Sequence, residues 1–314
     1  MSSDLFVGVD VGGTKVAAGL VDAHGEIRSQ TRVPMISSAS ALEGLNAVVS
    51  AIERVLPKSG VVQGIGICAP GPLDPYTGMV LNPPNVPCWR NFPLADEVRK
   101  LHSVPVKVDN DANAAALAET RWGASRGYNN VFYATIGTGI GTGIVFDGKI
   151  YHGRTGSAGE GGHVSIDYRG PLCRCGKPGC IEMFASGSAI GERARAKVAG
   201  VKQSLMIELA GGEPAKVSGE VVARAHAAGD ALATELLTET AAMLALWLSN
   251  MIDLLDPEVI VIGGGAAALY QPFLDQIRHR IPEITLNPRA HEVPIVSARY
   301  GADSGIAGGA ALCG

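Results

Sequence analysis

One local pattern occurs twice in this chain and limits the folds that the chain can adopt. A short apolar stretch over residues 5–10 runs into a glycine turn, a second apolar stretch over 16–22 and an Ala-His-Gly turn. The same order of apolar stretch, glycine-rich turn, apolar stretch and Asp-Gly turn returns over residues 131–150. Short apolar runs bounded by turn residues are typical of β-strands, and a repeated hairpin indicates a duplicated architecture.

The rest of the sequence alternates between helical and strand patterns. Residues 41–56 place leucine, valine and isoleucine at helical spacing, and residues 61–68 return to an apolar strand pattern. A long apolar segment from residue 231 ends before Pro257, because proline cannot continue a helix, and residues 259–265 have the pattern of a buried strand with a glycine turn. The chain is therefore predicted to be an α/β protein.

Composition and charge exclude several classes of protein. With 314 residues, 46% hydrophobic content and 41 glycines, the chain has ample material for large cores and many tight turns. Its formal net charge of −4 argues against DNA or anionic lipid as the main partner. It begins without signal-peptide features, and no run approaches roughly 18 apolar residues. We expect a soluble cytoplasmic protein that binds no nucleic acid or membrane, with its six cysteines reduced.

Three thiols and an imidazole are concentrated in HVSIDYRGPLCRCGKPGCIE, residues 163–182. Zinc takes four nitrogen or sulfur ligands in a tetrahedron, and the segment supplies that number. These candidate ligands are His163, Cys173, Cys175 and Cys180. A complete shell leaves no position for water, so the ion would stabilise a loop with little apolar material. Three unrelated cysteines are the plain alternative, and a zinc module for nucleic acid is poorly supported because paired CxxC knuckles are absent.

Three glycine-rich turns, at residues 12–14, 137–139 and 263–265, can bring backbone N–H groups against a phosphate. Taken alone, each turn is more often ordinary hairpin geometry, and none matches a P-loop or a GxGxxG that opens a helix. Lys15 adds a positive charge beside the first turn, although a solvated surface lysine explains it equally well.

Two carboxylates and an amide end the apolar stretch in VDNDANAAALAE, just before an alanine-rich run. An aspartate in that place is commonly the N-cap of a helix, which is the plain interpretation of Asp109 and Asp111. Glu160 would ordinarily be a surface glutamate, and Asn85, which follows two prolines, would ordinarily be a turn residue. These residues by themselves leave the chemistry open.

Several motifs occur together and in a fixed order: DVGGTK at 10–15, APGPLD at 69–74, DNDANAAALAE at 109–119, IGTGIGTGI at 136–144, GEGGH at 159–163, CRCGKPGCIE at 173–182 and VIGGG at 261–265. In these motifs the chain resembles the ROK family of bacterial sugar kinases and sugar-responsive repressors. The resemblance implies an actin/hexokinase-like (ribonuclease H-like) α/β fold, duplicated into two lobes that face each other across a cleft. We expect a small lobe over 1–117, to which residues 300–314 return as a helix. The larger lobe would span 118–299 and carry the zinc loop 163–182.

The resemblance also implies roles for individual residues. Asp111 aligns with the family's catalytic base, Asp109 would be structural, and Asp10 would hold hydrated Mg²⁺. The residues expected at ATP are Gly12, Gly13, Thr14, Lys15, Gly137, Thr138, Gly139, Gly263, Gly264 and Gly265. Those expected around the sugar are Asn85, Asn110, Asp111, Glu160, His163 and Glu182. His163 would give one ring nitrogen to zinc and keep the other for a sugar hydroxyl.

The implied function is ATP-dependent phosphorylation of a hexose. Residues 82–94 resemble the segment of glucose-phosphorylating members, so glucose is the first choice, with N-acetylmannosamine, N-acetylglucosamine and fructose as alternatives. A sugar-sensing regulator would need a DNA-binding segment before Asp10, where this sequence has nine residues. Polyphosphate-using relatives generally lack the cysteine cluster, which favours ATP. We also expect a homo-oligomer, a dimer or tetramer, and we expect loss of zinc to impair sugar binding while nucleotide binding survives.

Overall fold

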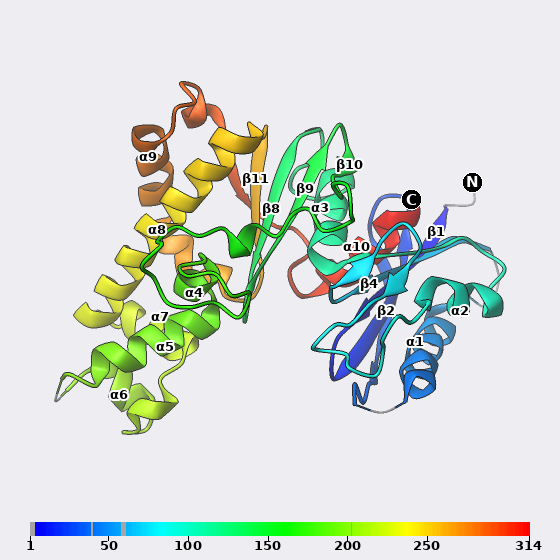
Figure 1. Ribbon diagram of the computed structural model, residues 1–314, viewed down its shortest axis with the longest axis horizontal. Coiled ribbons are helices and arrows are strands. Elements are labelled where there is room, and N and C mark those ends of the chain that lie inside the picture. The colour runs from blue at the N-terminus through cyan, green and yellow to red at the C-terminus, as the bar shows by residue number, and fades with distance from the viewer. Residues whose placement is uncertain (1–3, 39, 58–60, 202) are drawn as a thin grey trace. The chain divides into compact units, whose positions relative to one another are not determined.

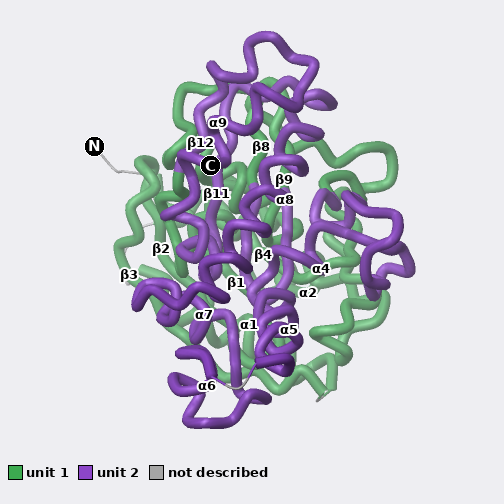
Figure 2. Tube along the Cα trace, turned by 90° about the vertical axis from the view of Figure 1, so that its left-hand side faces the viewer, with its two compact units in different colours: residues 1–133, 143–159, 297–314 green, residues 134–142, 160–296 purple. Residues whose placement is uncertain are grey.

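The protein divides into two compact units, shown in Figures 1 and 2; the computed structural model describes residues 4–38, 40–57, 61–201 and 203–314. Unit 1 comprises residues 1–133, 143–159 and 297–314, and unit 2 comprises residues 134–142 and 160–296. The boundary that we expected near Leu117 lies inside a helix of unit 1, and the chain enters unit 2 after Tyr133 instead.

Unit 1 contains a five-stranded mixed sheet. Its strands are β1 (Leu5–Val11), β2 (Lys15–Asp22), β3 (Ile27–Pro34), β4 (Val62–Ala69) and β7 (Val106–Asn110). Their order is β3-β2-β1-β4-β7; β1 pairs antiparallel with β2 and parallel with β4, and β4 pairs parallel with β7. The first hairpin and the strand after the first helix are thus present where the sequence predicted them.

Three helices and a short hairpin complete the N-terminal part of unit 1. They are α1 (Ala41–Val55), β5 (Leu73–Asp74), β6 (Met79–Val80), α2 (Leu94–Leu101) and α3 (Asp111–Arg121). Helix α1 begins with a capping box, in which the Ser40 side chain accepts from the Glu43 N–H and the Glu43 carboxylate accepts from the Ser40 N–H. Its buried residues Val48 and Ile52 join the apolar core beneath β1 and β4.

The C-terminal helix α10 (Ser304–Cys313) packs on the same sheet through glycines. It contacts β1, β4 and α3, so the end of the chain returns to unit 1 and keeps α3 there. A Cβ on Gly8 of β1 would lie 1.8 Å from the carbonyl oxygen of Ile306, and one on Gly66 of β4 would lie 1.8 Å from that of Gly309. The backbone of the helix therefore lies against the backbone of both strands, an approach that only glycine permits.

Gly66→Ala is expected to destabilise unit 1 strongly, because the added methyl group would meet the backbone of α10 and the helix would have to shift. Overpacking of this kind costs about 3 kcal/mol, which should lower the melting temperature by about 5–10 °C in a thermal unfolding experiment. Gly200→Ala is the control, since the nearest heavy atom to its Cβ would lie 3.9 Å away. Equal melting temperatures for the two variants would contradict the close packing of α10 on β4.

A second five-stranded sheet follows the first in the chain. Its strands are β8 (Val131–Ile136), β9 (Ile140–Phe146), β10 (Lys149–Ile150), β11 (Val259–Gly263) and β12 (Ile295–Ser297). The order is β10-β9-β8-β11-β12 (Figure 1). In both sheets the first strand in the chain is central, the second and third follow on one side, and the fourth and fifth follow on the other. This shared order confirms the duplication that the repeated hairpin predicted.

Unit 2 is rich in helices. Its α-helices are α4 (Glu182–Ala185), α5 (Gly187–Val198), α6 (Leu205–Leu209), α7 (Gly219–Ala227), α8 (Ala231–Leu255) and α9 (Leu274–Ile284). Among the described residues, only α8 is long and apolar enough to cross a membrane by length and composition. Half of its most apolar window is buried, and Trp247 and Leu248 are fully enclosed, as in the core helix of a globular protein. The helix ends at Leu255, with Asp256 as its C-cap, before Pro257 as predicted.

Candidate active site

Two of the residues that we predicted at the reaction centre, Asn110 and Asp111, lie where strand β7 meets α3. Asn110 is the N-cap of α3, because its Oδ1 accepts a hydrogen bond from the N–H of Ala112 at 2.9 Å. Asp111 is the first residue of the helix, so the plain interpretation of Asp109 or Asp111 as the cap is wrong. The cap uses Oδ1 of Asn110 and leaves the Nδ2 donors for another partner.

Asp109 is buried behind this junction. Its Oδ1 accepts from the N–H of Asn110 at 2.7 Å and from Nδ2 of Asn113 at 3.2 Å, and its Oδ2 lies 2.6 Å from Nε2 of His152. These contacts hold the turn between β7 and α3. Sequence analysis missed His152, since a lone histidine after a short strand carries no signal of such a contact.

Asp10 lies near the end of β1 and is strongly affected by its surroundings. Burial, followed by the negative charge of Asp111, raises the pKa of Asp10 to about 6. The positive charges of Lys15 and Arg32 oppose that shift. A Cβ on Gly305 would lie 2.3 Å from Cγ of Asp10, so glycine lets the first turn of α10 approach this carboxylate. A carboxylate whose ionisation is opposed by burial and by a neighbouring negative charge suits a divalent cation, which would neutralise its charge.

The first predicted glycine turn connects β1 to β2. The N–H of Gly12 donates to the carbonyl oxygen of Lys15 at 2.9 Å, and the carbonyl oxygen of Thr14 accepts from Met35. A Cβ on Gly13 would lie 2.7 Å from the carbonyl oxygen of Asn85. The turn therefore packs against the loop that carries Asn85, one of the predicted sugar ligands.

Unit 2 contains a cavity of about 1010 Å³, here called the α5–α7 pocket. Its lining includes Gly137, Thr138 and Gly265, so two of the predicted glycine turns meet there. Gly264 has φ +91°, and a Cβ on it would lie 2.4 Å from the carbonyl oxygen of Ile136, so the third turn requires glycine. Three other glycines of these two turns were predicted to bind ATP, but they lie outside the pocket lining. They are Gly139, Gly263 and Gly264.

Two helix N-termini supply this pocket with backbone donors. Ser186 caps α5 by accepting from the N–H of Ala189 at 3.2 Å, and Ser218 caps α7 by accepting from that of Val221 at 3.3 Å. The first turns of both helices line the pocket, together with Arg195. Helix N-termini favour anions such as phosphate. Sequence analysis missed this part of the site, although the Ser-Gly pair at each helix start is a recognisable signal.

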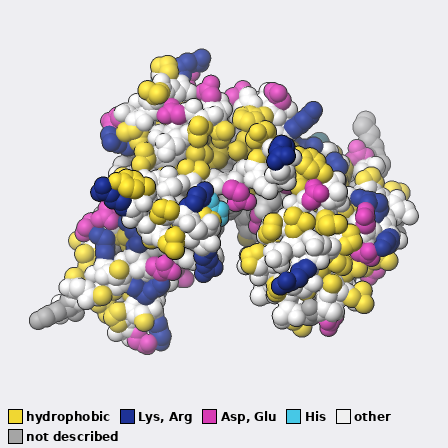
Figure 3. Space-filling model, viewed as in Figure 1, with side chains coloured by type: hydrophobic (Ala, Val, Ile, Leu, Met, Phe, Trp, Pro, Cys, Tyr) yellow, Lys and Arg dark blue, Asp and Glu magenta, His cyan; other side chains and the backbone are white. Residues whose placement is uncertain are grey.

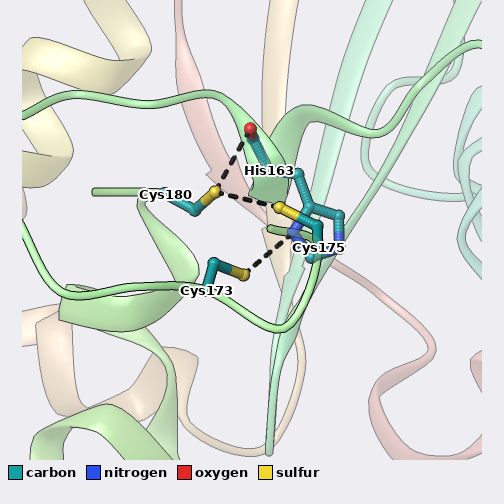
Figure 4. Close-up of side chains that lie close together, drawn as sticks. All are labelled: His163, Cys173, Cys175 and Cys180. Atoms are coloured by element: carbon teal, nitrogen blue, oxygen red, sulfur yellow. Dashed lines mark hydrogen bonds between the residues drawn. The ribbon is translucent and has the colours of Figure 1, made fainter. Parts of the chain in front are cut away.

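The four predicted metal ligands converge, with all their ligand atoms within 4.8 Å of one another. Figure 4 shows Nδ1 of His163 facing Sγ of Cys173 at 3.5 Å. It also shows Sγ of Cys175 facing Sγ of Cys180 at 3.5 Å. In a tetrahedral zinc site with zinc–sulfur bonds of about 2.3 Å, neighbouring ligand atoms lie about 3.5–3.8 Å apart. The donor identity and number and these two separations are therefore compatible with a zinc site.

Tight backbone turns hold the cysteine loop, and the thiols affect one another's ionisation. The N–H of Cys173 donates to the carbonyl oxygen of Lys177 at 2.9 Å. Gly179 has φ +68°, and a Cβ on it would lie 1.7 Å from the carbonyl oxygen of Asp167. Burial, followed by the nearby thiols, raises the pKa of Cys180 to about 12. Thiols so close together can all be ionised only when a cation compensates their charges.

The two predicted sugar-binding glutamates lie in different surroundings. Glu160 is exposed and precedes the 3-10 helix Gly161–His163, with its carbonyl oxygen accepting from the N–H of His163 at 3.1 Å. Glu182 begins α4, and its Oε2 accepts from the N–H of Ile140 at 2.8 Å. One carboxylate oxygen of Glu182 is therefore engaged beside the second glycine turn, a contact that sequence analysis missed.

The duplicated sheets and paired glycine turns define an actin/hexokinase-like protein. The ROK family model matches residues 6–314. Glucokinase of Halalkalibacterium halodurans is 36% identical over 315 residues, covering 98% of this chain and 94% of the relative. Glucokinase of Streptomyces coelicolor is 34% identical over 311 residues, covering 98% and 97%. A ROK family glucokinase from Streptomyces griseus, solved with glucose and AMPPNP, superposes with a TM-score of 0.81 at 34% identity over 98% of both chains. The chain therefore belongs to the ROK family, which confirms the resemblance in its motifs.

Proposed function

We propose that this protein transfers the γ-phosphoryl group of ATP to the 6-hydroxyl of glucose. The observation that carries the proposal is its similarity, over 98% of the chain, to glucokinases, one of them solved with glucose and AMPPNP. N-acetylmannosamine, N-acetylglucosamine and fructose are less well supported as acceptors, because the relatives at 34–36% identity are glucokinases. A regulator without catalytic activity is disfavoured for the same reason.

Asp111 is the general base in this reaction. As O6 of glucose attacks the γ-phosphorus, the carboxylate accepts the hydroxyl proton and a new O–P bond forms. The bond between the γ-phosphorus and the bridging oxygen breaks, and ADP leaves with the electron pair. Asp111 is the first residue of α3, so its carboxylate lies at the positive end of the helix dipole.

The α5–α7 pocket is our candidate for the nucleotide site. Its volume, about 1010 Å³, is at the upper end of the range for small-molecule sites. Backbone donors at Thr138 and at the two helix starts would meet phosphate oxygens, and Ala266 and Leu269 would border the adenosine. The Gly12–Lys15 turn is proposed as a second set of phosphate donors.

Two metal ions complete the proposal. Mg²⁺ would be held through water by Asp10, and it would neutralise charge on the transferred and leaving phosphates. Zn²⁺ would be structural and bound by the four-residue cluster, with His163 ligating through Nδ1. Nε2 of His163, on the other side of the ring, would then bond a sugar hydroxyl. The other proposed sugar ligands are Asn85, Asn110, Glu160 and Glu182.

Asp10→Asn is expected to remove most activity and yet stabilise the Mg²⁺-free protein at about pH 7.5. Because its pKa is raised from 3.8 to about 6, ionising Asp10 in the folded state costs roughly 3 kcal/mol. Well below pH 4 the Asp10 carboxyl is protonated in both the folded and the unfolded protein, so it costs no stability there. The destabilisation grows as the pH rises to about 6. Denaturant unfolding at several pH values should therefore show wild-type stability falling through this range relative to the mutant. Parallel pH profiles for the two proteins would contradict the expectation.

The function is tested by a coupled assay of purified protein with a panel of hexoses and with ATP, GTP and polyphosphate as donors. We expect the highest kcat/KM with glucose and ATP. A higher kcat/KM for N-acetylmannosamine, or no turnover of any hexose, would overturn the assignment. Identification of the product as the 6-phosphate completes the test.

The proposed partners are small molecules. On the face shown in Figure 3, Lys/Arg and Asp/Glu side chains are interspersed, without the single-sign patch that nucleic-acid binding uses. We propose a cytoplasmic enzyme, active as a homodimer or homotetramer. Light scattering of the purified protein measures the oligomeric state directly.

A further inference from the structure

The second glycine turn is held at its C-terminal end by a carboxylate. The N–H of Ile140, directly after the turn, donates to Oε2 of Glu182 at 2.8 Å. A Cβ on Gly139 would lie 2.4 Å from the same oxygen, so glycine is what lets the carboxylate reach the turn. Hydrogen bonds to a charged acceptor are stronger than those between neutral groups.

The N-terminal end of the turn is held by the same stretch of chain. The N–H of Gly187, at the start of α5, donates to the carbonyl oxygen of Gly137 at 2.8 Å, and within the turn Gly137 donates to Gly139 at 2.9 Å. Residues 182–187 therefore contact the turn 137–140 at both ends. Gly137, Thr138 and Gly187 all line the α5–α7 pocket, so this contact shapes its wall.

The stretch that holds the turn begins at the cysteine cluster. Cys180 is fully buried two residues before Glu182, and its Sγ lies 3.5 Å from Sγ of Cys175. Ile181 lies between Cys180 and Glu182, and its N–H donates to the carbonyl oxygen of Val164 at 3.0 Å. Val164 directly follows His163, the fourth member of the cluster. Displacement of Cys180 would therefore move the glutamate that holds the turn.

We propose that Glu182 is a positioning residue that links the cysteine cluster to the glycine turn, so that a bound metal supports nucleotide binding as well as sugar binding. The inference rests on the proposed function, which assigns the turn to ATP. It revises the expectation from sequence that loss of metal spares the nucleotide site. The contact uses Oε2 and leaves Oε1 to the sugar, so one carboxylate would serve both substrates.

Calorimetric titration of AMPPNP with Mg²⁺, in the absence of sugar, tests the link. Glu182→Ala and Gly139→Ala break the contact from its two sides, and each should raise the Kd for AMPPNP about 10-fold. The double variant should be no weaker than either single one, since both remove the same interaction. Glu182→Gln keeps a carbonyl oxygen that can accept from Ile140, so its Kd should stay within about threefold of wild type.

Glu160→Ala is the matched control. Glu160, like Glu182, is a glutamate that we propose as a sugar ligand. Unlike Glu182, it is exposed. The substitution should weaken glucose binding and leave the Kd for AMPPNP unchanged within about twofold. Equal AMPPNP affinities for Glu182→Ala, Gly139→Ala and wild type would overturn the link.

Metal removal probes the other end of the link. After chelation and gel filtration, with the metal content measured by plasma mass spectrometry, wild type should bind AMPPNP about 10-fold more weakly, and Glu182→Ala should lose little more. An unchanged affinity for AMPPNP in folded, metal-free wild type would overturn the proposal. If the metal-free protein unfolds, the AMPPNP affinities of Glu182→Ala and Gly139→Ala decide instead. Fully loaded wild type that binds no AMPPNP would instead refute the proposed function, a separate failure.

Discussion

Asp111→Asn is expected to lower kcat by on the order of 10²-fold or more, because the amide cannot accept the proton of the attacking hydroxyl. The amide keeps the shape of the carboxylate and can still hydrogen-bond a hydroxyl, so glucose affinity should stay within a few-fold of wild type. Removal of one carboxylate beside the half-buried Asp10 should also leave the protein folded. Steady-state kinetics and glucose titration of the purified variant measure both quantities.

The neighbouring Asp109→Asn is the comparison for this prediction. The native Asp109 carboxylate makes its shortest hydrogen bonds to the N–H of Asn110 and to Nε2 of His152. An asparagine at position 109 can still accept from the Asn110 N–H and contact His152. We therefore expect a smaller loss of kcat, less than about 10-fold. A folded Asp111→Asn protein that retains half of the wild-type kcat would remove Asp111 from the role of base.

The parts of the structure that the sequence predicted well depend on local patterns. The hairpin over β1 and β2 follows from apolar runs around a glycine turn, and α8 follows from a long apolar segment that ends at Pro257. The convergence of one histidine and three cysteines was predicted for a similar reason, since the chemistry of thiols and imidazole identifies possible ligands before their geometry is known.

The parts that sequence reasoning missed depend on contacts between distant segments. Glu182 and Ile140 are 42 residues apart, and nothing in either segment indicates that a carboxylate meets that backbone N–H. The expected boundary near Leu117 failed because α3 packs against α10, which comes from the other end of the chain. The preference of aspartate for N-caps was also misleading at α3, where Asn110 performs that role.

Cys175→Ser is expected to lose zinc and to lower kcat/KM for glucose by on the order of 10²-fold, although no cysteine is proposed to touch substrate. A hydroxyl is a poor zinc ligand, so three donors would remain where four are needed. Cys175 is the exposed member of the cluster, whereas Cys173 and Cys180 are buried. The substitution therefore removes a ligand with little effect on packing, and the loss of activity can be assigned to the metal.

The loss should appear in both steady-state constants for glucose. Without the ion, Nδ1 of His163 loses its fixed position, so KM for glucose rises as the sugar loses a ligand. Poorer alignment of the 6-hydroxyl with the γ-phosphorus also raises the barrier itself, so kcat falls as well. The contact between Glu182 and the glycine turn adds a rise in KM for ATP, which the sequence alone did not lead us to expect. A variant without zinc by plasma mass spectrometry that phosphorylates glucose with wild-type kcat and KM would show that the cluster does not support the active site.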